Sequence, residues 1–265
     1  MTVEPPSFAA YLRHLRTHGR EAQRNGPLNR AELATQAKTA FSYVTKLEQG
    51  AAQHPSPEVV DNLADALGVD DVERRHLHDL VAYDRDAGMP PAETGGAVDV
   101  TDQMRTYIDN LVPHLAGMVD DAWNVLYSNT EYARIYRHLA EPAVGNVLVW
   151  FFQVPEARAI MIDWETEARL TVAWLRALMV RRPRSGLFLP LLDRLSASPD
   201  FRRMWSSQQV LMGRPSPYMF VHDLDRNEDL RLLAEVYPWP DPTKALQMYL
   251  GVRVTTDGDV RSRRG

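Results

Sequence analysis

The sequence predicts two domains of different fold class: an all-α N-terminal domain of five helices, and an α+β C-terminal domain with one antiparallel sheet. Apolar residues recur at helical spacing through residues 8–83. A stretch rich in proline and glycine follows at 87–98, and beyond it helical patterns give way to three apolar, strand-like runs. We therefore expect domains at residues 1–86 and 99–256, a linker at 87–98 and a disordered tail at 257–265.

Composition limits the classes of protein to which the chain can belong. It has 265 residues, of which 45% are hydrophobic, and no cysteine, which indicates a soluble protein of a reducing cytoplasm without disulfides. No apolar run approaches the roughly 20 residues that span a bilayer, and the first residues lack the pattern of a signal peptide. The net charge is −5, yet residues 1–50 hold seven basic and four acidic residues, and local charge is what attracts phosphate.

The N-terminal elements follow in order. Residues 8–15 have the apolar spacing of a first helix, and residues 28–50 predict two short helices joined by a tight turn. Asn29 is the expected N-cap of the first of these two helices, with Glu32 as its capping-box partner. Gly50 suits the left-handed residue that ends the second helix. This is the layout of a helix-turn-helix, whose second helix can enter the major groove of DNA.

Two further helices complete the expected N-terminal domain. Ser56 is the N-cap of the first, with Pro57 at its first helical position. Asp70 and Glu73 form the start of the second, which is expected to end near Tyr83.

The region as a whole resembles the Cro/repressor type of helix-turn-helix, which phage repressors and many bacterial regulators of the Xre family use to bind DNA. The likeness rests on LNRAELA (28–34), SYVTKLEQG (42–50) and SPEVVDNLADALGV (56–69). Two positions depart from the pattern. Lys38 occupies the turn where glycine is usual, at a cost of about 1 kcal/mol if its φ is positive. Ala40 replaces the usual polar cap, so Thr39 is expected to cap the recognition helix.

Seven residues around the second helix of the motif are expected to contact DNA. By the general code of base recognition, Lys46 can donate to guanine, Ser42 to several bases, and Phe41 can touch the methyl group of thymine. Arg30 is placed to bind a phosphate, which positions the domain without specifying a sequence. The alternative is that these are ordinary solvated side chains of a helical bundle. The full set is Arg30, Thr39, Phe41, Ser42, Tyr43, Thr45 and Lys46.

The C-terminal domain is predicted to begin with a short hairpin that turns at Asp120–Asp121. The apolar run at 147–152 is expected to be a buried segment. The predicted helices are 130–139, 163–181, 187–195 and 199–208. The predicted strands are 116–119, 124–128, 218–224, 230–237 and 245–255. Elements in this order favour one antiparallel sheet with helices on one face.

Four segments of this half carry a second resemblance. They are VDDAWNVLYSN (119–129), NVLVWFFQVPEARAIMIDWE (146–165), ARLTVAWLR (168–176) and SPDFRRMWSSQQV (198–210). Through them, residues 105–255 resemble the MmyB-like ligand-binding domain, which follows a Cro/repressor-type domain in many bacterial regulators. The resemblance implies a PAS-like fold and a long-chain fatty acid as a candidate ligand. Gln208 and Gln209 stand where histidine and aspartate are commoner in that family.

Aromatic and methionine side chains of this half are candidates for an apolar pocket, because methionine adapts to flexible ligands. Core packing is the alternative for each of them. Arg169 and Arg176, seven apart on one helix, either pair with a ligand carboxylate or bridge to Glu165 or Glu167. The candidate ligand-binding residues are Trp123, Trp150, Phe152, Arg169, Arg176, Met179, Met219 and Met248; Phe151, Trp174 and Met212 belong to the same aromatic and methionine-rich group.

The sequence contains no nucleophile elbow and no phosphate-binding loop, and it predicts no metal site. His14 and His18 are four apart on a helix but lack a third ligand nearby. We therefore expect a homodimeric transcription regulator that binds double-stranded DNA and a hydrophobic small molecule, with no cofactor, membrane or enzymatic activity. The alternative is a protein-interaction or ligand-sensing module without a DNA operator of its own.

Overall fold

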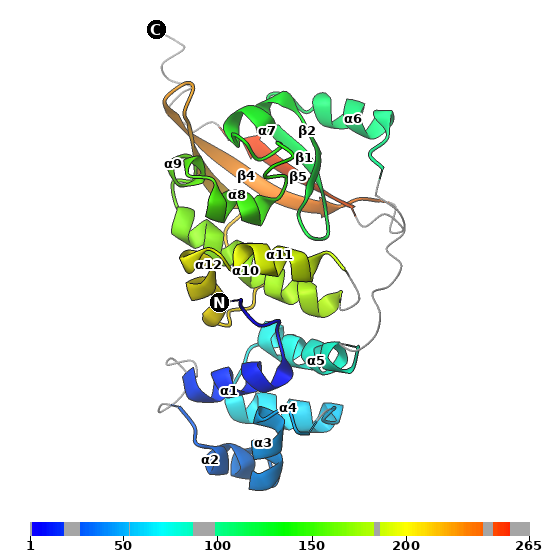
Figure 1. Ribbon diagram of the computed structural model, residues 1–265, viewed down its shortest axis with the longest axis vertical. Helices are drawn as coiled ribbons and strands as arrows, with labels where there is room; N and C mark the ends of the chain where they lie inside the picture. Colours follow the sequence, from blue (N-terminus) through cyan, green and yellow to red (C-terminus); the bar gives the residue numbers. More distant parts are fainter. Residues whose placement is uncertain are drawn as a thin grey trace.

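The computed structural model describes residues 2–18, 27–52, 54–86, 99–182, 186–240 and 246–254. The expected linker at 87–98 and the expected tail at 257–265 lie outside the described residues. An N-terminal bundle of helices forms one end of the molecule, and a domain with a β-sheet forms the other (Figure 1).

The local sequence explains where the helices of the N-terminal bundle begin and end. The Asn29 side chain accepts hydrogen bonds from the N–H groups of Ala31 (2.9 Å) and Glu32 (3.0 Å), and the Asn29 N–H donates to the Glu32 carboxylate (2.7 Å). The Ser56 hydroxyl caps the fourth helix, and Gly50 follows the third with a φ of 68°. The helices are α1 (Phe8–His18), α2 (Arg30–Gln36), α3 (Phe41–Glu48), α4 (Pro57–Leu67) and α5 (Asp71–Asp86).

One apolar core holds this bundle together. Each of its helices contributes a leucine that is at most 1% exposed, and their side chains pack against one another. These leucines are Leu12, Leu33, Leu47, Leu63 and Leu77. The helical period places such residues on one side of each helix, which explains why five short helices form one bundle.

The C-terminal domain contains a single antiparallel sheet in the order β2-β1-β5-β4-β3. Its strands are β1 (Leu115–Asp120), β2 (Val125–Ser128), β3 (Tyr218–Asp223), β4 (Glu228–Pro238) and β5 (Leu246–Arg253). The helices of this domain are α6 (Asp102–Asp109), α7 (Thr130–Ile135), α8 (Val147–Gln153), α9 (Glu156–Ile160), α10 (Trp164–Arg181), α11 (Phe188–Leu195) and α12 (Pro199–Ser206). The predicted combination of an all-α region and an α+β domain is confirmed.

Helices cover both faces of this sheet, which differs from the expectation of helices on one face. The main core lies between one face and helices α7–α12. On the opposite face, Met104 and Ile108 of α6 pack against Ala116 and Met118 of β1. The sequence analysis did not predict α6, which begins where the Thr101 hydroxyl accepts a hydrogen bond from the Met104 N–H (3.4 Å).

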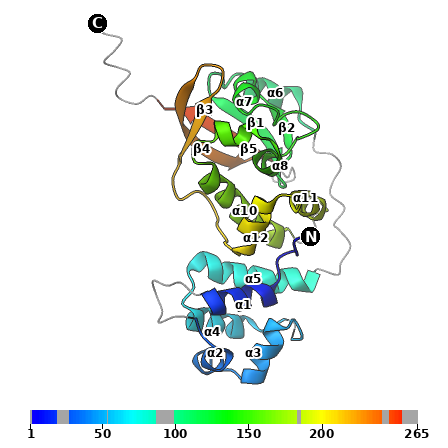
Figure 2. The ribbon, with the colours of Figure 1, turned by 60° about the vertical axis from the view of Figure 1, so that its left-hand side comes forward.

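The last turns of α10 are embedded in the N-terminal bundle. Val180 is 3% exposed and belongs to the same apolar cluster as the leucines of that bundle. The Arg181 guanidinium pairs with the Asp79 carboxylate of α5 (3.2 Å). Figures 1 and 2 both show α5 beside α10. Near the start of the chain, the Trp205 indole N–H of α12 donates to the Glu4 carbonyl (3.0 Å), which adds a second connection.

None of the helices in the described parts of the chain combines the length and the hydrophobicity that a bilayer span requires.

Candidate functional site

The outer face of α3 is open. Val44 and Leu47 anchor the helix in the core, and the opposite face presents Ser42, Lys46 and a Phe41 side chain that is 56% exposed. Helix α3 lies at the end of the bundle remote from the C-terminal domain (Figure 1). A surface of this kind can approach a DNA duplex without obstruction by the rest of the chain.

The turn before α3 has the predicted strain but not the predicted cap. Lys38 has a φ of 52°, as expected for the position where glycine is usual. Ala40 is the N-cap of α3, and no side chain caps the helix there, so the expectation that Thr39 takes this role is wrong. The Thr45 hydroxyl donates to the Phe41 carbonyl within the helix (3.0 Å), and Tyr43 is half-buried against the core.

A buried carboxylate joins three helices behind the recognition surface. Glu48, at the end of α3, is 1% exposed and binds Arg16 of α1 and Arg30 of α2; the Arg30 Nε lies 2.7 Å from Oε2. Burial alone would raise the pKa of Glu48, but the hydrogen bonds from the two arginines outweigh it and lower the pKa. The predicted phosphate-binding residue Arg30 is therefore held in place by an ion pair with Glu48. The sequence analysis missed Glu48 because nothing in its spacing marks a buried charge.

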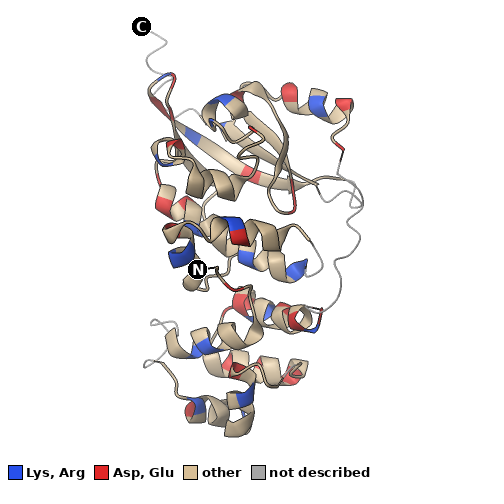
Figure 3. Ribbon diagram, viewed as in Figure 1, with Lys and Arg blue, Asp and Glu red and all other residues tan. Residues whose placement is uncertain are grey.

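Figure 3 shows Lys and Arg mixed with Asp and Glu in both parts of the molecule. Attraction to phosphate must therefore come from a few local contacts rather than from a broad positive field.

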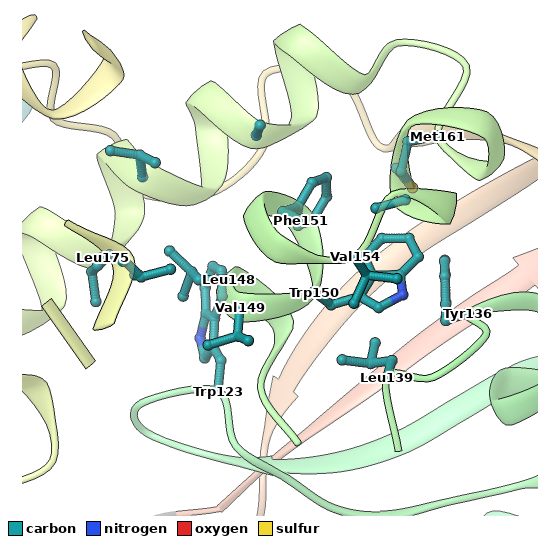
Figure 4. Close-up of a cluster of buried hydrophobic side chains, with 14 of the residues drawn as sticks. Trp123, Tyr136, Leu139, Leu148, Val149, Trp150, Phe151, Val154, Met161 and Leu175 are labelled. Carbon is teal, nitrogen blue, oxygen red and sulfur yellow. The ribbon is translucent and has the colours of Figure 1, made fainter. Parts of the chain in front are cut away.

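An apolar cavity of about 110 Å³ lies in the C-terminal domain, bounded by the sheet, α8 and α10. Figure 4 shows Trp150 of α8 beside Tyr136 in a cluster of buried hydrophobic side chains, and their ring centroids are 5.5 Å apart. The aromatic side chains that line the cavity are Trp123, Tyr132, Tyr136, Trp150, Phe151, Trp174 and Tyr249. Apolar walls with few polar groups are typical of small-molecule sites.

Trp123 is held over the cavity by the turn between β1 and β2. The backbone φ of Trp123 is 62°, a value that residues other than glycine rarely adopt. Its ring lies edge-on to that of Trp174, with the ring centroids 5.2 Å apart. The Asp120 carboxylate fixes the turn by accepting hydrogen bonds from the N–H groups of Ala122 and Asn124, both at 2.9 Å. Although these bonds lower the pKa of Asp120, burial outweighs them and raises it.

The polar groups of the cavity include two pairs, one of charged side chains and one of tyrosine hydroxyls. Glu167 of α10 receives two hydrogen bonds from Arg214, each of 2.6 Å. Burial by itself lowers the pKa of Arg214, but the contact with Glu167 outweighs it and raises the pKa. The hydroxyl groups of Tyr136 and Tyr249 are 2.8 Å apart. Sequence analysis did not predict Arg214 or the tyrosines, which come from distant parts of the chain.

Only three of the predicted ligand-binding residues line this cavity: Trp123, Trp150 and Met219. Phe152 packs instead against Trp164 and Phe201, and Met179 lies in the core. Met248 belongs to the cluster on the opposite face of the sheet. Phe151 and Trp174, from the larger aromatic group, do line the cavity.

The two predicted arginines are engaged elsewhere. Arg169 pairs with Glu165 one turn away (3.1 Å), which is the alternative that its spacing offered. Arg176 is 1% exposed, and it donates to the Gln208 side chain (2.7 Å) and lies over the Trp205 ring at 4.0 Å. Burial lowers the pKa of Arg176 to about 9. Neither arginine reaches the cavity, because its side of α10 faces away from it.

Family models match both parts of the chain. Residues 7–77 match a helix-turn-helix domain, and residues 100–259 match the MmyB-like transcription regulator ligand binding domain, which covers more than half of the chain. A comparison with curated proteins finds no match. The chain therefore belongs to the MmyB-like family of transcription regulators, with a DNA-binding helix-turn-helix domain ahead of its ligand-binding domain.

Proposed function

We propose that this protein is a dimeric, sequence-specific regulator of the cytoplasm whose DNA affinity responds to an apolar small molecule in the aromatic cavity. The observation that carries the proposal is the path of α10. Glu167, Leu170, Thr171 and Trp174 of this helix line the cavity, and Val180 packs in the core of the DNA-binding bundle.

One helix thus connects the cavity with the core of the DNA-binding bundle. Glu167 and Val180 are thirteen residues apart, which in an α-helix is roughly 20 Å. A ligand changes DNA binding only if it has different affinities for the DNA-competent and DNA-incompetent arrangements. A shift of α10 upon filling the cavity supplies such a difference, because the far end of the helix cannot move without disturbing the packing around Val180.

The proposed contacts with DNA centre on Lys46 and Ser42, which are exposed on α3. Replacing both with alanine should abolish a gel shift on the operator, since each good base contact is worth about 1–3 kcal/mol. The operator is first obtained by selection from a random DNA pool. Arg75→Ala, an exposed change on α5, is the control and should leave binding within about twofold.

The gel shift also separates this function from that of a protein-interaction module. Sequence-specific binding should survive competitor DNA, and its log affinity should fall linearly with log salt. Loss of the shifted band on adding competitor, or full binding by the double variant with an intact circular-dichroism spectrum, would refute the assignment.

A long-chain fatty acid is the ligand that the family resemblance implies, and the apolar lining supports the broader class. Protein purified from cells should release an acyl lipid on denaturation, detected by mass spectrometry. Protein that carries no small molecule after purification, and that takes up none on incubation with a lipid extract, would speak against a lipid ligand.

Dimerisation is proposed because a helix-turn-helix of this type reads two half-sites about one helical turn apart, and one copy offers few basic contacts. Sedimentation velocity at micromolar concentration should give twice the mass of one chain. A monomer that stays a monomer on its operator would contradict this part of the proposal.

A further inference from the structure

The charged groups that line the cavity leave no free charge for a ligand among the described residues. Arg214 meets Glu167 in two parallel hydrogen bonds of 2.6 Å each, and its remaining contacts are with the carbonyl oxygens of Tyr218 and Ser216, both at 3.2 Å. The side chains of Arg214 and Glu167 are 19% and 9% exposed, so water screens the pair only weakly.

This pairing works against a ligand that carries a carboxylate. To reach the guanidinium, the carboxylate would have to displace Glu167, which would leave a second negative charge nearby without its partner. To bind elsewhere, it would lie against aromatic rings with no cation to balance it. Both arrangements bury an unpaired charge, which proteins avoid because of the loss of hydration.

The tyrosine pair, by contrast, favours a ligand that carries a hydrogen-bond acceptor. In the contact between the hydroxyls of Tyr136 and Tyr249, only one group can donate to the other. The second hydroxyl hydrogen has no acceptor among the residues that the structure describes. Both phenols have a pKa raised by burial, so both stay protonated near neutral pH. A hydrogen-bond acceptor on a ligand would complete this pair.

We infer that this cavity takes an uncharged, largely apolar molecule with one hydrogen-bond acceptor, and that it discriminates against carboxylates. The inference rests on the proposed ligand-binding function of this cavity. It narrows the ligand from hydrophobic molecules in general to neutral ones, and so favours an uncharged acyl derivative over the free fatty acid that the family resemblance implies. Glu167 is the residue that sets the preference, because its carboxylate already occupies the place next to Arg214 that an acidic ligand would need.

Three probes of equal chain length test the inference: octan-1-ol, octanoate and octylammonium, each titrated below its micellar concentration into the full chain near neutral pH. Quenching of tryptophan fluorescence reports occupancy, since Trp123, Trp150 and Trp174 line the cavity. Octan-1-ol should bind at least about tenfold more tightly than either ion. Equal or tighter binding of octanoate or octylammonium overturns the inference and leaves the ligand-binding function standing. No binding by any of the three overturns both.

Glu167→Gln provides the second measurement. The amide is nearly isosteric but uncharged, so Arg214 is left with a positive charge that octanoate can balance. We expect the affinity for octanoate to rise about tenfold or more, with little change for octan-1-ol. Glu165→Gln is the matched control, because Glu165 lies on the same helix and pairs with Arg203 on the outer surface. An unchanged preference in a folded Glu167→Gln protein overturns the inference, and the wild-type series decides it if that variant does not fold.

Discussion

At the scale of single residues, the turn between α2 and α3 shows a local rule that the fold overrides. Lys38 takes the left-handed conformation, with a φ of 52°. The turn must still close, because Leu33 and Ala34 on one side and Val44 and Leu47 on the other share one core. Their burial compensates for the strain that a side chain brings to this position.

Lys38→Gly should therefore stabilise the protein by about 0.5–1 kcal/mol, because glycine adopts this φ without a Cβ clash. Chemical denaturation followed by circular dichroism measures the change. Thr35→Gly, at an exposed position inside α2, is the control and should destabilise by roughly 0.3 kcal/mol. A destabilised Lys38→Gly protein would show that the lysine side chain makes a favourable interaction that outweighs the strain.

Sequence alone predicted the composition of the cavity better than its geometry. The aromatic and methionine-rich group contained several of the lining residues, because hydrophobic side chains of this half must pack together. It could not specify which of them face the cavity. Helix α10 is buried on most of its surface, so its apolar pattern does not show that Glu167 faces inward and Arg169 outward. Arg214 reaches the cavity only through long-range packing, to which sequence spacing gives no access.

At the scale of elements, prediction succeeded where the chain carries start and stop signals. Helix α4 has a serine cap and a proline at its first position, and α10 has a long apolar face. Helix α8 was expected only as a buried segment, since its seven residues VLVWFFQ are apolar almost throughout and show no period. Helix α7 ends at Ile135, short of the predicted end at residue 139, because Tyr136 leaves the helical conformation with a ψ of 66°.

Helix α3 lacks a side-chain cap, so Ala40→Ser should restore one and stabilise the protein by about 1 kcal/mol. Thermal unfolding measures the gain. The matched comparison is Ser56→Ala, which removes the existing cap of α4 and should cost a similar amount. No gain from Ala40→Ser, alongside a clear loss from Ser56→Ala, would mean that the backbone at residue 40 cannot direct a hydroxyl to the first turn of α3.

At the scale of the whole molecule, two parts that are separate in the sequence share one packing unit. Val180 of α10 is buried among the apolar side chains of the N-terminal bundle, and Arg181 pairs with Asp79 beside it. Within the bundle, His76 of α5 is 3% exposed and its ring lies edge-on to that of Tyr11 at 4.9 Å. Burial, together with the charges of Arg176 and Arg181 of α10, lowers the pKa of His76. The two parts should therefore unfold as one cooperative unit.

Val180→Asp should divide this unit, because it places an unpaired charge in the shared core. Scanning calorimetry of the wild type should show one unfolding transition, and the variant should show two. The transition at the lower temperature should correspond to a loss of about 3 kcal/mol or more in the free energy of unfolding. Arg181→Gln is the control; it removes a half-exposed ion pair and should cost about 1 kcal/mol at most. A single transition in Val180→Asp would mean that the two parts are coupled elsewhere.

The stability of this shared packing unit should depend on pH through His76. Burial, with help from Arg176 and Arg181, lowers the pKa of this imidazole to about 3 in the folded protein, against about 6.5 when unfolded. Between these values the unfolded chain binds more protons, so the free energy of unfolding falls as the pH is lowered from about 6.5. At about pH 5 the free energy of unfolding should be lower by on the order of 2 kcal/mol because of His76. His76→Phe should remove this contribution from the plot of unfolding free energy against pH. Equal slopes in the two proteins would contradict the assignment.

The position of Val180 has a practical consequence for dissecting the protein. A cut between the two matched family segments would take Val180 out of the core of the DNA-binding part and expose its side chain on the ligand-binding part. Each fragment would self-associate through the newly exposed apolar surface. Operator affinities or ligand screens performed on such halves would describe altered molecules, so the intact chain is the proper subject for both.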